Sequence, residues 1–112
     1  MPVDKLLIYC TCPDRASADR IAGHLVTERL AACVTITAPV VSVYTWQEKL
    51  ETTEEYLLLI KTSQSRYTEL EQAILSVHPY ELPEIIAVPI AQGLPAYLHW
   101  IDECTEPQQK TQ

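Results

Sequence analysis

The stretch from Cys33 to Trp46 reads Cys-Val-Thr-Ile-Thr-Ala-Pro-Val-Val-Ser-Val-Tyr-Thr-Trp and is β-branched or aromatic along most of its length. Residues of these types favour strands over helices. A polar reversal over residues 47–53 follows, and the apolar run within residues 55–62 predicts a second strand. Together the two segments predict a long β-hairpin.

We expect this hairpin to extend beyond the body of the protein. At about 3.3 Å per residue the first strand would span roughly 45 Å, whereas a compact chain of 112 residues has a diameter of about 35 Å. An uncovered strand carrying Val43 and Trp46 would aggregate unless a partner covered it, so self-association is expected. The alternative is that Pro39 divides the strand and folds its tip back.

The segment before the hairpin predicts a strand followed by a helix. Residues 5–12 are nearly continuously apolar, as in a strand that is covered on both faces. Asp14 is placed to cap a helix that runs to about Ala32, because apolar residues then recur with helical spacing.

The segment after the hairpin repeats this alternation. Ser63 or Ser65 can cap a second helix that ends at Pro79, and residues 84–90 predict a further strand. Pro95 suits the first turn of a short third helix. The order of elements predicts an α+β fold of the ferredoxin-like (β-α-β-β-α-β) type, with an antiparallel sheet and two helices on one face.

Composition limits the classes of protein and partner. A length of 112 residues with 47% hydrophobic content predicts one domain over residues 1–104, and we expect the polar tail of residues 105–112 to be disordered. A net charge of −7 argues against nucleic acid or an anionic membrane as the main partner. The N-terminal apolar run is too short for a signal sequence or a membrane span, so we expect a cytoplasmic protein.

The four cysteines are expected to be reduced thiols, because none forms a Cys-x-x-Cys motif and three lie in or beside apolar runs. Cys10 and Cys12 are two apart on a strand, so their thiols face the same way and can hold a soft ion such as Cu(I). The interpretation we favour from the residues alone is two small core side chains beneath the first helix.

The loop His78-Pro79-Tyr80-Glu81-Leu82-Pro83-Glu84 combines two stiffening prolines with polar side chains. Its hydroxyl and carboxylates suit a ligand or a subunit contact, since a rigid loop loses little entropy on binding. His78 can instead be a simple helix stop. Lys61, at the end of an apolar strand, is expected near a carboxylate or an anionic ligand, unless it merely emerges into water.

No catalytic constellation is recognisable, so we do not expect an enzyme. The histidines at positions 24, 78 and 99 have neither metalloprotease nor triad spacing. Only 2 glycines are present, which excludes a nucleotide P-loop.

Several motifs resemble those of the CutA divalent-cation-tolerance proteins, and the resemblance covers residues 3–104. The most specific are Ala31-Ala32-Cys33-Val34 and the loop of residues 78–84. The others are Thr11-Cys12-Pro13-Asp14, Ser42-Val43-Tyr44-Thr45-Trp46, Lys61-Thr62 and Tyr97-Leu98-His99-Trp100-Ile101.

This resemblance implies a homotrimer with a PII-like architecture that binds copper or another divalent cation. The metal ligands it implies are Cys10, Cys33 and His78. We further expect an intersubunit cleft that holds a metal ion or a small anionic ligand; its residues would be Trp46, Lys61, His78, Tyr80, Glu84, Tyr97 and Trp100. Three alternatives remain open: a PII-like small-molecule signalling module, an enzyme that uses the same clefts, and a structural trimer that acts through protein partners.

Two positions depart from the pattern of the family. Glu48 stands where relatives often carry glycine, so a positive φ there would cost about 1 kcal/mol or more. Cys12 replaces other small residues, and a metal role for it is therefore not implied by the resemblance.

Overall fold

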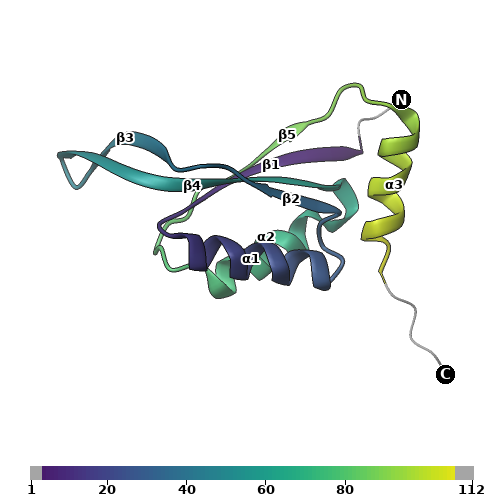
Figure 1. Ribbon diagram of the computed structural model, residues 1–112, viewed down its shortest axis with the longest axis horizontal. Helices are drawn as coiled ribbons and strands as arrows, with labels where there is room; N and C mark the ends of the chain where they lie inside the picture. The colour runs from purple at the N-terminus through teal and green to yellow at the C-terminus, as the bar shows by residue number, and fades with distance from the viewer. Residues whose placement is uncertain (1–3, 108–112) are drawn as a thin grey trace.

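The computed structural model describes residues 4–107. Its elements follow in the order β1 (Lys5–Cys12), α1 (Arg15–Thr27), β2 (Cys33–Ile36), β3 (Val40–Trp46), β4 (Lys49–Ser63), the 3-10 turn η1 (Gln64–Arg66), α2 (Tyr67–Val77), β5 (Ile85–Pro89) and α3 (Pro95–Thr105) (Figure 1).

The strands form an antiparallel sheet with the order β2-β4-β1-β5, and β3 pairs with the first half of β4. Helices α1 and α2 cover one face of this sheet, whereas α3 stands at its end (Figure 1). The predicted ferredoxin-like α+β fold is confirmed.

The core lies between the sheet and the two covering helices. Alternate residues of β1, from Leu6 to Cys12, point toward the helices, and Ile8, Cys10 and Cys12 have no exposed surface. They meet fully buried side chains of α1 and α2, which are Ala18, Ile21, Leu25, Leu70 and Ile74. Burial of each large aliphatic side chain contributes about 1.5–3 kcal/mol, so the period-two pattern of β1 anchors the fold.

The hairpin extends beyond the helices, as expected (Figure 1). Pro39 does divide the predicted strand, into β2 and β3, but both parts remain paired with β4 and the tip does not fold back. The protein is therefore 51 Å long but only 23 Å thick. Val41, Val43 and Leu50 on the hairpin are more than 60% exposed.

The turn of the hairpin is tighter than the expected reversal over residues 47–53. Only Gln47 and Glu48 connect β3 to β4, with φ values of 51° and 68°. Two consecutive positive φ angles are typical of two-residue hairpin turns that match the twist of the strands. The positive φ considered for Glu48 is confirmed, and this position carries backbone strain.

One predicted helix boundary and one predicted helix cap were wrong. Helix α1 ends at Thr27 rather than near Ala32, because Arg29 adopts φ 59° and the amides of Leu30 and Ala31 both donate to the Leu25 carbonyl. No serine side chain caps α2, which continues directly from η1.

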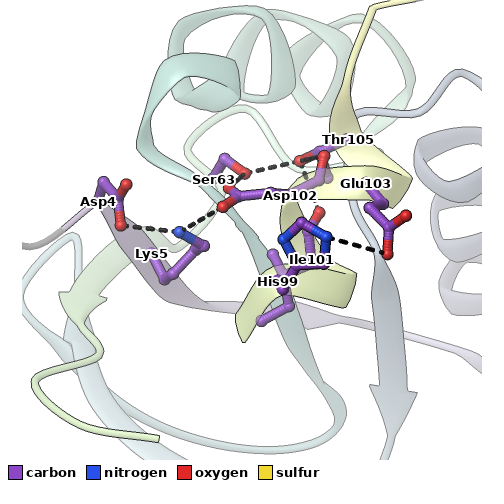
Figure 2. Close-up of polar contacts among 8 residues, drawn as sticks. All are labelled: Asp4, Lys5, Ser63, His99, Ile101, Asp102, Glu103 and Thr105. Carbon is purple, nitrogen blue, oxygen red and sulfur yellow. Dashed lines mark hydrogen bonds and ion pairs between the residues drawn. The ribbon is translucent and has the colours of Figure 1, made fainter. Parts of the chain in front are cut away.

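Helix α3 is attached to the sheet by a polar network at the start of β1 (Figure 2). The Lys5 ammonium, 8% exposed, lies 2.8 Å from Asp4 and 2.9 Å from Asp102. Burial alone would lower the pKa of Lys5, but its hydrogen bonds to the two carboxylates outweigh burial and raise it. The Ser63 hydroxyl donates a hydrogen bond to Asp102 Oδ1 at 3.0 Å and lies 2.6 Å from the Thr105 hydroxyl. One polar cluster therefore joins β1, β4 and α3.

The end of α3 lies inside the tail that was expected to be disordered. Thr105 is helical and buried, and the Arg29 guanidinium donates to the carbonyls of Glu103 and Glu106 at 2.6 and 2.7 Å. The remainder of that tail, residues 108–112, lies outside the described residues. Among the helices of residues 4–107, none combines the length and apolar character needed to cross a bilayer.

Candidate functional site

A cavity of about 650 Å³ lies between the β3–β4 hairpin and the loop of residues 78–84. Of the predicted cleft residues, Trp46, Tyr80 and Glu84 line it. The other lining residues are Thr11, Ser42, Val43, Tyr44, Glu55, Glu81 and Leu82. Side chains on β3 reach it because Ser42, Tyr44 and Trp46 alternate along one face of the strand.

Tyr80 joins the loop to the hairpin. Its hydroxyl donates to Glu55 Oε2 at 2.7 Å, and Glu55 is only 5% exposed. Burial raises the pKa of the Tyr80 hydroxyl, and its hydrogen bond to Glu55 raises it further. The hydroxyl is therefore a hydrogen-bond donor, not a proton source, at neutral pH.

His78 holds the loop against β1. Its Nε2 lies 2.8 Å from the Thr11 carbonyl, which can only accept, and its Nδ1 accepts from the Tyr80 amide at 3.0 Å. Both contacts require a neutral ring with the proton on Nε2. The ring also lies 5.0 Å from the ring of Tyr80. His78 thus sets the position of Tyr80, and through it one wall of the cavity.

His78 also completes a thiol–imidazole cluster with Cys10 and Cys12. One ligand atom from each of these residues lies within 4.8 Å of the other two, and Cys12 Sγ is 4.0 Å from His78 Nε2. Within residues 4–107 it is the one group of three or more His, Cys, Asp or Glu residues arranged closely enough to hold a metal ion.

The two thiols of this cluster differ in acidity. The hydrogen bond to Cys12, followed by burial, raises the pKa of Cys10, whereas the hydrogen bond from Cys10 lowers the pKa of Cys12. Cys12 is therefore the thiol that loses its proton more readily. Two sulfurs and an imidazole nitrogen form a donor set that suits soft or borderline ions such as Cu(I) and Zn²⁺.

Cys33 and Lys61 lie apart from this cluster. They are paired across β2 and β4, and the Lys61 ammonium lies 3.7 Å from Cys33 Sγ and 3.2 Å from the Thr35 hydroxyl. No carboxylate within residues 4–107 forms an ion pair with Lys61, contrary to one of our expectations. The chain brings Cys10 and His78 together with Cys12, not with Cys33.

Tyr97 and Trp100 also lie away from the cavity. Their rings contact each other on α3 with centroids 5.4 Å apart, and α3 is at the opposite end of the sheet from the hairpin (Figure 1). Each is 40% exposed, so a single chain does not bring all the predicted cleft residues together.

The charge of the cavity does not suit the small anionic ligand, which was one of the two ligands expected for the cleft. Among residues 4–107, Glu55, Glu81 and Glu84 line it, and no lysine, arginine or histidine does. A small anionic ligand is therefore disfavoured at this place. Sequence reasoning missed Glu55, although a carboxylate directly before the apolar run of residues 56–60 was a signal that could have been noticed.

The fold and the projecting hairpin define the class: a ferredoxin-like protein whose candidate binding region lies beside its hairpin. Residues 6–104 match the family described as CutA1 divalent ion tolerance protein, and the chain belongs to this family. The divalent-cation tolerance protein CutA of Thermus thermophilus is 42% identical over 99 residues, which cover 88% of this chain and 96% of that protein. The mouse protein CutA is 45% identical over 98 residues, covering 88% of this chain but 55% of the mouse protein. The chain thus spans about half the length of this mammalian relative.

Solved structures agree with this assignment. CutA from Xylella fastidiosa is 50% identical and superimposes with a TM-score of 0.90, covering 92% of this chain and 99% of that one. The periplasmic divalent cation tolerance protein CutA from Archaeoglobus fulgidus is 38% identical with a TM-score of 0.88, covering 91% and 99%.

Proposed function

We propose that this protein acts in divalent-cation tolerance by binding copper or another thiophilic metal ion, as a cytoplasmic homotrimer. The observation that carries the proposal is the convergence of Cys10, Cys12 and His78 at one point beneath the sheet. Family membership supports the link to divalent cations.

Metal binding at this cluster requires two changes. A ligating His78 Nε2 must give up its proton and its hydrogen bond to the Thr11 carbonyl, and the thiols must ionise. Since the pKa of Cys10 is raised, its proton is the harder one to displace. Affinity should therefore increase with pH, and binding should release protons.

The trimer is proposed from the exposed apolar surface. Val41, Val43 and Leu50 project from the hairpin, and Ile86 and Val88 are 53% and 45% exposed on β5. Within the described sheet β5 pairs only with β1, so its other edge is free. Edges and apolar surfaces of this kind are normally covered by another chain.

Calorimetry with Zn²⁺ and with Cu(I) under reducing conditions, combined with native mass spectrometry, tests both parts. We expect three subunits and one metal ion per subunit. Cys12→Ala should weaken binding at least about tenfold, and Cys104→Ala, on the distant α3, should not change it. Cys33→Ala distinguishes the observed cluster, which contains Cys12, from the ligand set implied by the resemblance, which contains Cys33. Unchanged metal affinity in this variant supports Cys12 as the second thiol ligand. Affinity no tighter than about 1 mM, or equal losses in Cys12→Ala and Cys104→Ala, would refute the metal site.

The cavity favours a second candidate function, a PII-like module that binds a small molecule. Its volume of about 650 Å³ lies within the range of about 300–1,000 Å³ that small-molecule sites occupy. This candidate does not depend on the metal site, because neither Cys10 nor Cys12 lines the cavity.

A further inference from the structure

The carboxylate of Glu55 is the most informative group in the cavity. Glu55 is 5% exposed, and within residues 4–107 it forms no ion pair. Its only hydrogen-bond partner among these residues is the Tyr80 hydroxyl, which contacts Oε2. A buried carboxylate is normally paired with a positive charge, so this one lacks its usual partner.

The second oxygen of Glu55 is not fully enclosed. Oε1 has no hydrogen-bond partner among the described residues. Every fully enclosed side-chain oxygen or nitrogen of these residues does have a partner, so Oε1 is not one of the enclosed atoms. Oε1 therefore retains accessible surface, and the cavity is the space that Glu55 lines. A ligand in the cavity can reach this oxygen.

The remaining walls combine negative charge with aromatic rings. Glu81 and Glu84 add two further carboxylates, and Tyr44, Trp46 and Tyr80 supply three aromatic side chains. Aromatic faces attract cations, and they also bury the apolar part of an organic ligand. Charge and ring content therefore favour a ligand that is both cationic and partly apolar.

An inorganic ion does not fit this cavity as well. A hard divalent cation takes about six to eight oxygen ligands at close range. The carboxylates of Glu55, Glu81 and Glu84 do not converge in this way, because the one metal-competent group within residues 4–107 is the thiol–imidazole cluster. Dispersed carboxylates around about 650 Å³ suit a larger molecule.

We propose that the cavity binds a small organic cation, an ammonium or guanidinium group on an apolar body. Glu55 pairs with the positive charge, and Tyr44, Trp46 and Tyr80 contact the body. The inference rests on the small-molecule candidate function and does not require a metal ion at Cys10, Cys12 and His78.

Three probes with a common aromatic body and different charge test the proposal on the full chain in its native assembly: 2-phenylethylammonium, 2-phenylethanol and 3-phenylpropanoate. By calorimetry and ligand-observed NMR, we expect the ammonium to bind at least about tenfold more tightly than the alcohol, and the carboxylate not to bind.

The matched variants are Glu55→Gln and Glu54→Gln. Both remove one charge from β4, but adjacent strand residues point to opposite faces, and Glu54 does not line the cavity. Glu55→Gln should weaken ammonium binding about tenfold and leave the alcohol unchanged, whereas Glu54→Gln should change neither. Glu84→Gln, at an exposed loop position, should weaken ammonium binding by a smaller factor. It replaces Glu55→Gln as the test variant if Glu55→Gln does not fold.

Several results would overturn the proposal. Equal affinities for the ammonium and the alcohol would leave a small-molecule site without charge selectivity. Competition by Mg²⁺ that requires Glu55 would indicate an inorganic ion. Failure of all three probes would refute the small-molecule candidate as well, and would be expected if a basic side chain of a neighbouring subunit already paired with Glu55. Cys12→Ala, which tests the metal site, should leave ammonium binding intact.

Discussion

Replacement of His78 by phenylalanine tests whether its ring nitrogens hold the loop beside the cavity. Phenylalanine keeps an aromatic ring next to Tyr80 but loses the contacts to the Thr11 carbonyl at 2.8 Å and the Tyr80 amide at 3.0 Å. Each hydrogen bond contributes about 1 kcal/mol net, and an acceptor left without its partner adds a further cost because Thr11 is buried. We expect His78→Phe to lower the free energy of unfolding by about 2–3 kcal/mol.

Denaturant titration followed by circular dichroism, at one fixed protein concentration, measures this change. His24→Phe is the matched control, because His24 is exposed on α1 and its side chain makes no hydrogen bond to residues 4–107; we expect a change within about 0.5 kcal/mol. A loss of stability in His78→Phe no larger than that in the control would refute the role assigned to the ring nitrogens.

Three further predictions concern the turn, the α3 attachment and the two binding sites. Glu48→Gly should raise the free energy of unfolding by about 0.5–1 kcal/mol in the same titration, because relief of the left-handed backbone outweighs the added flexibility of glycine; destabilisation would contradict the strain. Lys5→Met should lower the free energy of unfolding by about 1–2 kcal/mol; the loss is smaller than for a fully buried ion pair because Asp102 is 44% exposed. The raised pKa of Lys5 means that its stabilisation is present below about pH 10.4 and is lost as the pH rises through the raised value. The Lys5→Met variant should therefore not lose stability in this alkaline range. If its free energy of unfolding fell with rising pH as it does in the unaltered protein, the role assigned to Lys5 would be refuted. Zn²⁺ should weaken 2-phenylethylammonium binding about fivefold or more in calorimetry, because metal-bound His78 releases the loop; independent binding would show that it does not.

The sheet and the projecting hairpin were predictable because strand patterns are local. The run from Lys5 to Cys12 predicted β1 with its observed bounds, and the β-branched residues on both sides of Pro39 predicted one strand, which the structure divides into β2 and β3. The length of the hairpin relative to the expected diameter was enough to predict the overhang. The end of α1 was not predictable in this way, since residues 28–32 contain no glycine or proline that would stop a helix, and the backbone at Arg29 ends it.

The candidate sites depended much more on tertiary structure. Strand alternation alone placed the thiols of Cys10 and Cys12 on one face, where both are buried as predicted. The arrival of His78 beside them, 66 residues beyond Cys12 in the chain, depends on how α2 packs beneath β1. The same packing sets the loop that walls the cavity, so the sequence predicted the loop but not what it faces.

The sequence by itself determined the strand and helix order, the family and the donor types available for a metal or a ligand. Only the tertiary structure decided that Cys12, rather than Cys33, lies with Cys10 and His78, and that Glu55 is the buried carboxylate of the cavity. The physical reason is how far apart in the chain the interacting residues are. Side-chain alternation is fixed within a few residues of backbone, whereas convergence of donors and burial of charge require strands, helices and loops that are far apart in the chain to pack together.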